Sequence, residues 1–424
     1  MDCKIIENRF LNEKTYVYRL SCGLTVYISP KAGYTKQCAI FSVDYGSTDN
    51  AFRRAGDKEI TVIPDGVAHF LEHKLFESET GDAFAKYAKT GASANAFTSF
   101  DNTSYYFTCA DRFEENLKIL TDLMQTPYFT PENVAKEQGI IGQEINMYLD
   151  SPGWRVYFNL LEAMYRKHPV RRDIAGSVES ISHITSDLLY QCYHTFYTAP
   201  NMVLAICGDL DPEKTAQLVE SCMTSLDAGT PVERIEEDEP ASVYRHKTEQ
   251  KLAVSMPMFN IGFKDNVPYE HIAKKEIIGK IAMDYLFGKS SAFFEKAYDA
   301  GLINDSYDLE YSCEQTYAHP IISGDSLQAE RVLEEVLQTA EIARKDGIGE
   351  NDFARHIRLV KSSFIRGLNS VEFIARAWTE AHQKGYALYD YFTLCDTVTP
   401  QDINDYIRAV YTEEQCVTSV ILPK

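Results

Sequence analysis

The stretch AHFLEHKLFE, residues 68–77, places two histidines and a glutamate close together. His69, Glu72 and His73 stand at i, i+3 and i+4, so a helix here presents all three side chains on one face. Two imidazoles one turn apart can bind a single Zn²⁺, and the glutamate between them can reach a water on the metal. An isolated histidine is more often structural, but the HxxEH pattern as a whole predicts a zinc centre of the metalloprotease kind.

A catalytic zinc usually takes three protein ligands, so a third ligand is expected elsewhere in the chain. The predicted helix PENVAKEQGIIGQEINMYLDSP, residues 131–152, offers Glu132, Glu137 and Glu144. Glu137 and Glu144 are seven positions apart, which is two turns along one face. That spacing suits one ligand and one carboxylate that orients a ligating imidazole, although spacing alone equally allows a surface helix with exposed glutamates.

Around these segments the chain alternates strand and helix patterns. TYVYRL, LTVYIS and CAIFSVDYGS predict strands before the first helix, and SANAFTSFDNTSYYFTCA, residues 93–110, predicts two strands joined by the turn FDN. Residues 111–129 predict a helix that ends before Pro127. Its apolar stripe is expected to be core and consists of Phe113, Leu117, Leu120 and Met124.

An acidic, proline-containing stretch near the middle of the chain, residues 229–245, predicts a linker, with its charges serving solvation. Residues 184–207 align without a gap to residues 398–421 at a constant offset of 214 positions, which indicates an internal repeat. A weaker match, at an offset of 219, sets Glu137 against His356 and Glu144 against Ser363. We therefore predict a catalytic zinc-binding domain at 1–228 and a related domain without metal ligands at 246–424.

Composition limits the class of partner. A formal net charge of -20 and a pI near 5.0 argue against a nucleic-acid partner, because phosphate binding needs a basic surface. The acidic surface either keeps the protein soluble or attracts basic peptides. No apolar run is long enough to span a bilayer, the first residues do not resemble a signal peptide, and ten scattered cysteines fit a reducing compartment. We expect a cytoplasmic protein that does not enter a membrane.

The motifs together resemble a known family. GVAHFLEHKLFE, followed about 70 residues later by EQGIIGQEI, is similar to the inverzincin zinc peptidases, the family of pitrilysin, insulinase and the mitochondrial processing peptidase, in its small two-domain bacterial form. The resemblance implies that His69, His73 and Glu144 bind one Zn²⁺, that Glu72 is the catalytic base and that Glu137 supports a ligand. NAFT resembles the family's substrate strand, so the residues expected to pair with a peptide backbone are Asn95, Ala96, Phe97 and Thr98.

The same resemblance implies an α+β fold. It consists of two homologous α/β-roll domains of the mitochondrial processing peptidase type, each a mainly antiparallel sheet covered by helices, and two chains close into a clam-like chamber. One departure concerns an Arg and a Tyr that active relatives carry in the second half, where this chain has Ala297 and Asn304.

We therefore expect a zinc endopeptidase subunit that hydrolyses peptides or unfolded segments. A homologous partner would supply the missing Arg and Tyr in a heterodimer, although a homodimer is possible. The alternative is a catalytically weak or inactive subunit that binds peptides or organises a heteromeric complex.

Overall fold

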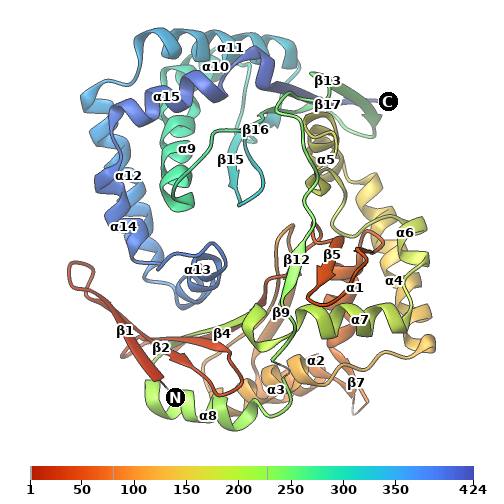
Figure 1. Cartoon of the computed structure of the whole chain (residues 1–424). Helices are drawn as coiled ribbons and strands as arrows, with labels where there is room; N and C mark the ends of the chain where they lie inside the picture. The colour runs from red at the N-terminus through yellow and green to blue at the C-terminus, as the bar shows by residue number, and fades with distance from the viewer. Residues whose placement is uncertain (1, 80, 227) are drawn as a thin grey trace. The chain divides into compact units, whose positions relative to one another are not determined.

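The computed structural model describes residues 2–79, 81–226 and 228–424, and its helices and strands are shown in Figure 1. The chain forms two compact units, each made of three segments. The first comprises Met1–Ile145, Asp173–Glu236 and Ile365–Tyr389, and the second comprises Asn146–Arg172, Glu237–Phe364 and Asp390–Lys424. The predicted boundaries 1–228 and 246–424 thus differ from the compact units. Residues 146–172 of the first half belong to the second unit, and residues 365–389 of the second half belong to the first unit.

The first unit contains a mainly antiparallel seven-stranded sheet in the order β1-β2-β3-β11-β4-β10-β9, in which only the β3–β11 pair is parallel among the described strands. Apolar residues fill its centre, and every residue of β11 is buried. The strands are β1 (Asp2–Asn8), β2 (Glu13–Arg19), β3 (Thr25–Pro30), β4 (Gln37–Val43), β9 (Ser93–Thr98), β10 (Thr103–Cys109) and β11 (Met202–Gly208). Two small sheets add β5 (Ala51–Arg54), β6 (Thr61–Val62) and β12 (Val232–Arg234), and β7 (Glu77–Ser78) with β8 (Gly81–Asp82).

The second unit contains a five-stranded sheet in the order β13-β17-β14-β16-β15. Its strands are β13 (Lys247–Leu252), β14 (Met258–Phe263), β15 (Asp308–Cys313), β16 (Ala318–Asp325) and β17 (Cys416–Pro423). The pairing directions repeat those of β3-β11-β4-β10-β9, with a parallel β13–β17 pair followed by antiparallel pairs. The α+β class and the two related mainly antiparallel sheets are therefore as predicted.

Helices pack against each sheet. In the first unit α13 (Val371–Gln383) packs on β3, β4 and β11, and in the second α5 (Pro152–Met164) packs on β14 and β17. Each of these helices comes from the opposite half of the sequence, which explains why the compact units do not follow a single cut in the linker. The remaining α-helices are α1 (Val67–Leu75), α2 (Ala83–Thr90), α3 (Phe113–Gln125), α4 (Pro131–Asp150), α6 (Val178–Ser182), α7 (Ser186–Phe196), α8 (Pro212–Cys222), α9 (Ile272–Phe287), α10 (Ala292–Asp299), α11 (Ala329–Asp346), α12 (Glu350–Gly367), α14 (Asp390–Leu394) and α15 (Pro400–Val410).

The internal repeat is visible in the caps of two helices. Thr185 caps α7 and Thr399 caps α15, each accepting a backbone N–H of the first turn on its hydroxyl. Tyr197 and Tyr411, 214 positions apart, end these helices with the same backbone angles, φ -84° with ψ 62° and 65° respectively. The strands that follow, β11 and β17, are also equivalent in their sheets.

The predicted elements around the site are present. The two strands of residues 93–110 form the hairpin β9–β10, and α3 ends at Gln125, before Pro127, with its predicted apolar stripe buried. Residues 229–245 were predicted to be a linker without regular structure. Within them the structure forms β12, which pairs with β5. The local sequence VER carries no strand signal, and the pairing is a tertiary effect.

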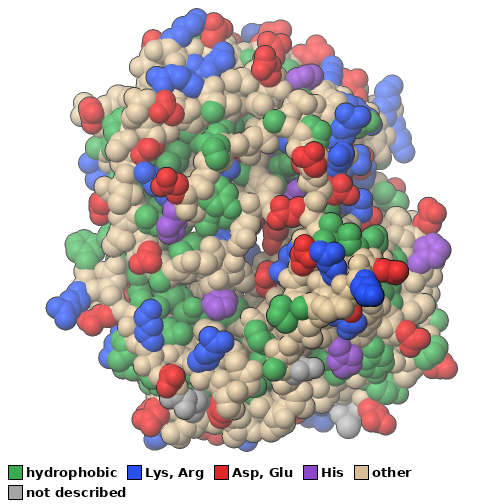
Figure 2. Space-filling view, in the orientation of Figure 1, with side chains coloured by type: hydrophobic (Ala, Val, Ile, Leu, Met, Phe, Trp, Pro, Cys, Tyr) green, Lys and Arg blue, Asp and Glu red, His purple; other side chains and the backbone are tan. Residues whose placement is uncertain are grey.

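The surface and the cysteines match the composition. Acidic and basic side chains are interspersed on the face that Figure 2 shows. All ten cysteines are free thiols. None of the helices in the described part of the chain is both long enough and apolar enough to cross a membrane.

Candidate metal centre

The short helix α1 carries three of the predicted site residues. It begins after Gly66, whose φ of 97° and whose contact with a neighbouring backbone both require glycine, because an added Cβ would lie 2.5 Å from the carbonyl oxygen of Ala175. Its apolar residues, Phe70 and Leu71 among them, are fully buried and fix the rotation of the helix. The rings of His69 and His73 consequently lie side by side, with their centroids 4.6 Å apart.

The long helix α4 brings a carboxylate to these imidazoles. Glu144 Oε1 lies 3.8 Å from His69 Nε2, and Glu144 Oε2 lies 3.5 Å from His73 Nε2. One donor atom from each of the three residues lies within 4.8 Å of the other two. Among the described residues, this is the group of histidine, cysteine and acidic side chains that is spaced closely enough to hold a metal ion. The structure thus brings together the three residues that were predicted as ligands, although they are separated by up to 75 positions in the sequence.

These distances suit a tetrahedral zinc ion. Donors that each lie about 2.0–2.1 Å from a tetrahedral centre are about 3.3 Å apart, which is close to the separations between Glu144 and the two imidazoles. Two imidazoles and one carboxylate form a known catalytic zinc set with a fourth position left for water or substrate. The donor set also accommodates Mn²⁺ or Co²⁺, so the residues fit a divalent ion of this group rather than zinc alone.

Glu137 orients one of the two histidines. Its Oε1 lies 3.0 Å from His73 Nδ1, and it is the one carboxylate among the buried residues of α4. Burial lowers the pKa of His73, but the hydrogen bond to Glu137 and the charges of Glu72 and Glu144 outweigh it and raise that pKa overall. A hydrogen bond that His73 donates through Nδ1 leaves Nε2 directed at Glu144, which is the arrangement expected of a ligand held by a supporting carboxylate.

The other residues of α4 and α1 near this pair have distinct places. Glu132, which the sequence also offered, is exposed in the first turn of α4. Lys74, which the sequence analysis missed, has a fully buried side chain that forms ion pairs with Glu77 and, at 3.7 Å, with Glu137 Oε2. No sequence signal distinguishes this lysine from an exposed one.

His69 is suited to bind a metal as a neutral imidazole. Burial lowers its pKa to about 4, so the ring carries no proton on one nitrogen near neutral pH. Its Nδ1 is buried without a hydrogen-bond partner among the described residues, while its Nε2 faces Glu144. A metal bound at Nε2 would use the lone pair that the neutral ring offers there.

Glu72 is held by the edge strand of the sheet. Thr98 Oγ1, at the end of β9, donates a 2.6 Å hydrogen bond to Glu72 Oε2. Burial raises the pKa of Glu72, which brings this carboxylate closer to the range of a general base that works near neutral pH. The sequence predicted Thr98 only as a substrate residue, so its contact with the glutamate is a finding of the structure.

The remaining predicted substrate residues lie along β9. This strand is the last of its sheet and is paired with β10 on one side. Asn95 Oδ1 accepts the backbone N–H of Ala96 at 2.9 Å, and the guanidinium of Arg376 lies 5.1 Å from the ring centre of Phe97. An edge strand with backbone groups held by a movable side chain is compatible with the pairing of an extended peptide.

Comparisons with known proteins identify the family of the chain. Residues 61–178 match the model of the insulinase family, peptidase family M16, and residues 183–360 match the model of the peptidase M16 inactive domain. An uncharacterised zinc protease of Bacillus subtilis, YmfH, is 40% identical over 99% of both chains. A putative M16-like peptidase from Alicyclobacillus acidocaldarius has a crystal structure that matches with a TM-score of 0.94 and 34% identity, covering 99% of this chain and 100% of the other.

A more distant relative is a probable β subunit of the mitochondrial processing peptidase of Arabidopsis thaliana, which is 29% identical over 44% of this chain and 36% of its own. The matches cover both halves, and the first family model spans the HxxEH helix and the glutamates of α4. The chain therefore belongs to the insulinase family of peptidases, peptidase family M16.

Proposed function

We propose that this chain is a zinc-dependent endopeptidase that hydrolyses peptides or unfolded polypeptide segments. The observation that carries the proposal is the convergence of His69, His73 and Glu144, with the Glu72 carboxylate beside them and held by Thr98. A scaffold protein would need neither three converging ligands nor a half-buried carboxylate between two of them. The free thiols of the chain fit the cytoplasmic location that we also propose.

A bound Zn²⁺ would supply Lewis acidity, which polarises a peptide carbonyl and lowers the pKa of water. The residues of the chain would do the rest. Glu72, with Oε2 fixed by Thr98, would accept the proton of the attacking water on Oε1 and pass it to the leaving amine. Glu137 would hold the ring of His73 in its ligating orientation.

The substrate backbone would pair with β9 along Asn95, Ala96 and Phe97. The peptide would take over the Ala96 N–H that the Asn95 side chain accepts in the absence of substrate. Because this mode of binding reads backbone groups, we expect a loose sequence preference and a requirement for extended, unfolded segments.

We further propose that full activity needs a second, related chain. Ala297, at the place of the family's arginine, is 1% exposed, and Asn304, at the place of the tyrosine, donates to the Asp325 carbonyl at 3.2 Å. Ala297 has no hydrogen-bond donor on its side chain, and the Asn304 amide, already bonded to a backbone carbonyl, offers neither the positive charge of an Arg nor the hydroxyl of a Tyr. A homologous partner that supplies both groups would complete the site in a heterodimer, with a homodimer as the other possibility.

Glu72→Gln provides the test. The variant should retain about one zinc per chain in elemental analysis and should lose peptide cleavage, because the metal ligands are intact and the base is removed. If the wild-type chain binds no stoichiometric metal, the scaffold alternative is correct. Co-purification from the native host tests the partner, since wild-type activity that does not rise with any co-purified protein would contradict the need for a second chain.

A further inference from the structure

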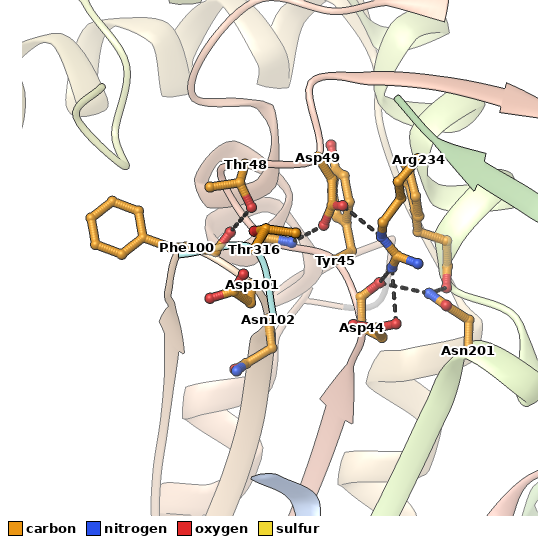
Figure 3. A network of polar contacts seen from close by, with 12 residues as sticks. Asp44, Tyr45, Thr48, Asp49, Phe100, Asp101, Asn102, Asn201, Arg234 and Thr316 are labelled. Carbon is orange, nitrogen blue, oxygen red and sulfur yellow. Dashed lines mark hydrogen bonds and ion pairs between the residues drawn. The ribbon is translucent and has the colours of Figure 1, made fainter. Parts of the chain in front are cut away.

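The segment of residues 44–50, which we call the brace, links β4 to β5 and contacts the turn that follows the substrate strand. The Ser47 N–H donates to the Ser99 carbonyl at 3.1 Å, and both the N–H and the hydroxyl of Thr48 donate to the Phe100 carbonyl, at 2.9 and 2.7 Å. Gly46 permits this contact, because a Cβ there would lie 2.3 Å from the Phe100 carbonyl oxygen. The brace therefore fixes the end of β9, directly after Thr98 (Figure 3).

The other end of the brace contacts the approach to the metal helix. Asn50 Nδ2 donates to Asp65 Oδ1 at 3.1 Å, and the Asn50 carbonyl accepts the Ile63 N–H at 2.9 Å. Helix α1, with His69 and Glu72, begins at Val67, two residues after Asp65. The same seven-residue segment thus contacts both the turn that follows the strand expected to hold the peptide and the chain that leads into the helix expected to hold the metal.

One residue of the linker strand holds the brace. Arg234, the last residue of β12, donates from Nε to Asp49 Oδ1 at 2.6 Å, and its Nη2 lies 3.0 Å from Asp44 Oδ2 and also donates to the Asp44 carbonyl (Figure 3). Asp49 in turn accepts the Gly46 N–H on Oδ2 at 2.8 Å, which closes the brace upon itself. Asp49 is 7% exposed, so a guanidinium with two donors in a fixed plane is the natural counter-ion for it.

Loss of the Arg234 guanidinium would also weaken the hydrogen bond within the brace. Burial raises the pKa of Asp49 to about 6 even with Arg234 beside it, so without that charge the carboxyl would protonate near neutral pH. A neutral carboxyl is a weaker acceptor for the Gly46 N–H. The brace would therefore lose its bonds to Arg234, and its internal bond between Gly46 and Asp49 would weaken.

We propose that Arg234 is a positioning residue for the peptidase site: through Asp44 and Asp49 it fixes the brace, and the brace fixes β9 relative to α1. Arg234 lies two residues before Glu236, where the second segment of the first compact unit ends. The position of β12 would thereby affect peptide binding at β9. This inference rests on the proposed function, because it takes β9 as the peptide-binding strand.

The test compares Arg234→Gln with Arg53→Gln in a Glu72→Gln background, in which peptide is bound and not cleaved. Arg53 is a matched control, since it forms an exposed ion pair with Glu233 across the same β5–β12 ladder. The probe is a fluorescein-labelled unstructured peptide long enough to pair with all 6 residues of β9, and its binding is followed by fluorescence anisotropy with zinc present. Arg234→Gln should weaken binding by about tenfold, whereas Arg53→Gln should leave it unchanged.

Hydrogen exchange separates positioning from general destabilisation. In Arg234→Gln, exchange should rise at residues 93–102 and remain unchanged in α3, zinc content should stay at the wild-type value, and Arg234→Lys should recover part of the affinity because it keeps the charge. Equal peptide affinity in the Arg234→Gln and Arg53→Gln proteins, or faster exchange throughout the first unit, would overturn the inference. Should the wild type bind neither zinc nor peptide, the proposed function fails, yet the exchange at 93–102 still decides whether Arg234 fixes β9.

Discussion

Glu239 offers the sharpest stability prediction, because a single carboxylate of the linker holds together several parts of the second unit. It accepts the backbone N–H groups of Arg166, Lys167 and His168 at 2.6 to 3.0 Å and the Nζ of Lys264 at 2.5 Å. The acidic linker was predicted to serve solvation, but this residue has a side chain only 13% exposed. Replacing it by Gln removes the charge and keeps one acceptor oxygen.

The expected magnitude follows from the pKa of the two partners. Burial raises the pKa of Glu239, but the hydrogen bond from Lys264 and those from the backbone outweigh it and lower the pKa to about 2. A fall to that value from 4.5 corresponds to about 3 kcal/mol of stability in the charged state. For the partner Lys264, burial has the larger effect: it lowers the pKa of the lysine although the adjacent Glu239 carboxylate raises it. This desolvation cost of the lysine remains in the variant, so Glu239→Gln should lose about 2 to 3 kcal/mol at neutral pH.

The sign of the pH dependence is fixed by the depressed pKa. The stabilisation is fully present above the unfolded-state value near 4.5 and disappears as the pH falls towards about 2, so the difference between wild type and variant should shrink across that window. Urea unfolding measures it, and the two tryptophans separate the units, because Trp154 lies in the second and Trp378 in the first. In a Trp378→Phe background the fluorescence of Trp154 reports the unit that contains Glu239.

The matched control is the exposed neighbour Glu237, whose change to Gln should alter the unfolding free energy by less than about 0.5 kcal/mol. Equal stability of the two variants at neutral pH would refute the reasoning. So would a difference for Glu239→Gln that stays constant from neutral pH down to about pH 3, because a charge effect must titrate.

Three further outcomes are expected. Glu144→Gln should abolish stoichiometric zinc binding, whereas Glu137→Gln should keep the stoichiometry and weaken the affinity by about 10- to 100-fold, as measured by chelator competition. Gly46→Ala should lower the unfolding free energy by at least about 2 kcal/mol, because the new Cβ meets a backbone carbonyl at 2.3 Å; Gly139→Ala, on an open face of α4, should be neutral or stabilising in the same urea titration. Thr98→Val should lower kcat by about tenfold with zinc retained while Thr98→Ser keeps most of it, and equal rates for the two would mean that the hydroxyl does not orient the base.

Much of the site could be predicted because its signals are local. The i, i+3, i+4 spacing of α1 and the seven-residue spacing on α4 each place side chains on one helix face, and the structure brings both faces together. The hairpin of residues 93–110 has β-branched and aromatic residues on both sides of a turn, and it formed as predicted. Each of these patterns lies within one helix or one hairpin, but the roles of Glu137 and Glu144 were implied by the family resemblance, because spacing alone equally allowed a surface helix.

The parts that escaped prediction depend on distant contacts. Strand β1, DCKIIEN, is mostly exposed and has no clear alternation, so only its pairing with β2 defines it. Arg234 meets Asp44 and Asp49 across more than 180 positions, and nothing in VERIEEDE distinguishes this arginine from a solvated one. The apolar faces of α5 and α13 show that each covers a sheet but not which sheet, and both cover the sheet of the other half of the sequence.

The two halves show what the fold itself requires and what the metal chemistry adds. In the first, α1 packs on β9 and β10 and its His73 bonds to Glu137 of α4 at 3.0 Å; in the second, α9 packs on β15 and β16 and its Asp284 bonds to His356 of α12 at 2.9 Å. An imidazole and a carboxylate therefore join the same pair of helices in both halves, with the residue types interchanged. The second half keeps this imidazole–carboxylate bond although Ser363 stands at the position of Glu144. Among the described residues, the group spaced to hold a metal lies in the first half. We therefore infer that the bond holds the two helices together independently of any metal. Under the proposed function, His69 and Glu144 would turn such a pair into a set of metal ligands, so substitution at Glu144 should remove the metal and leave the fold of α1 and α4 intact.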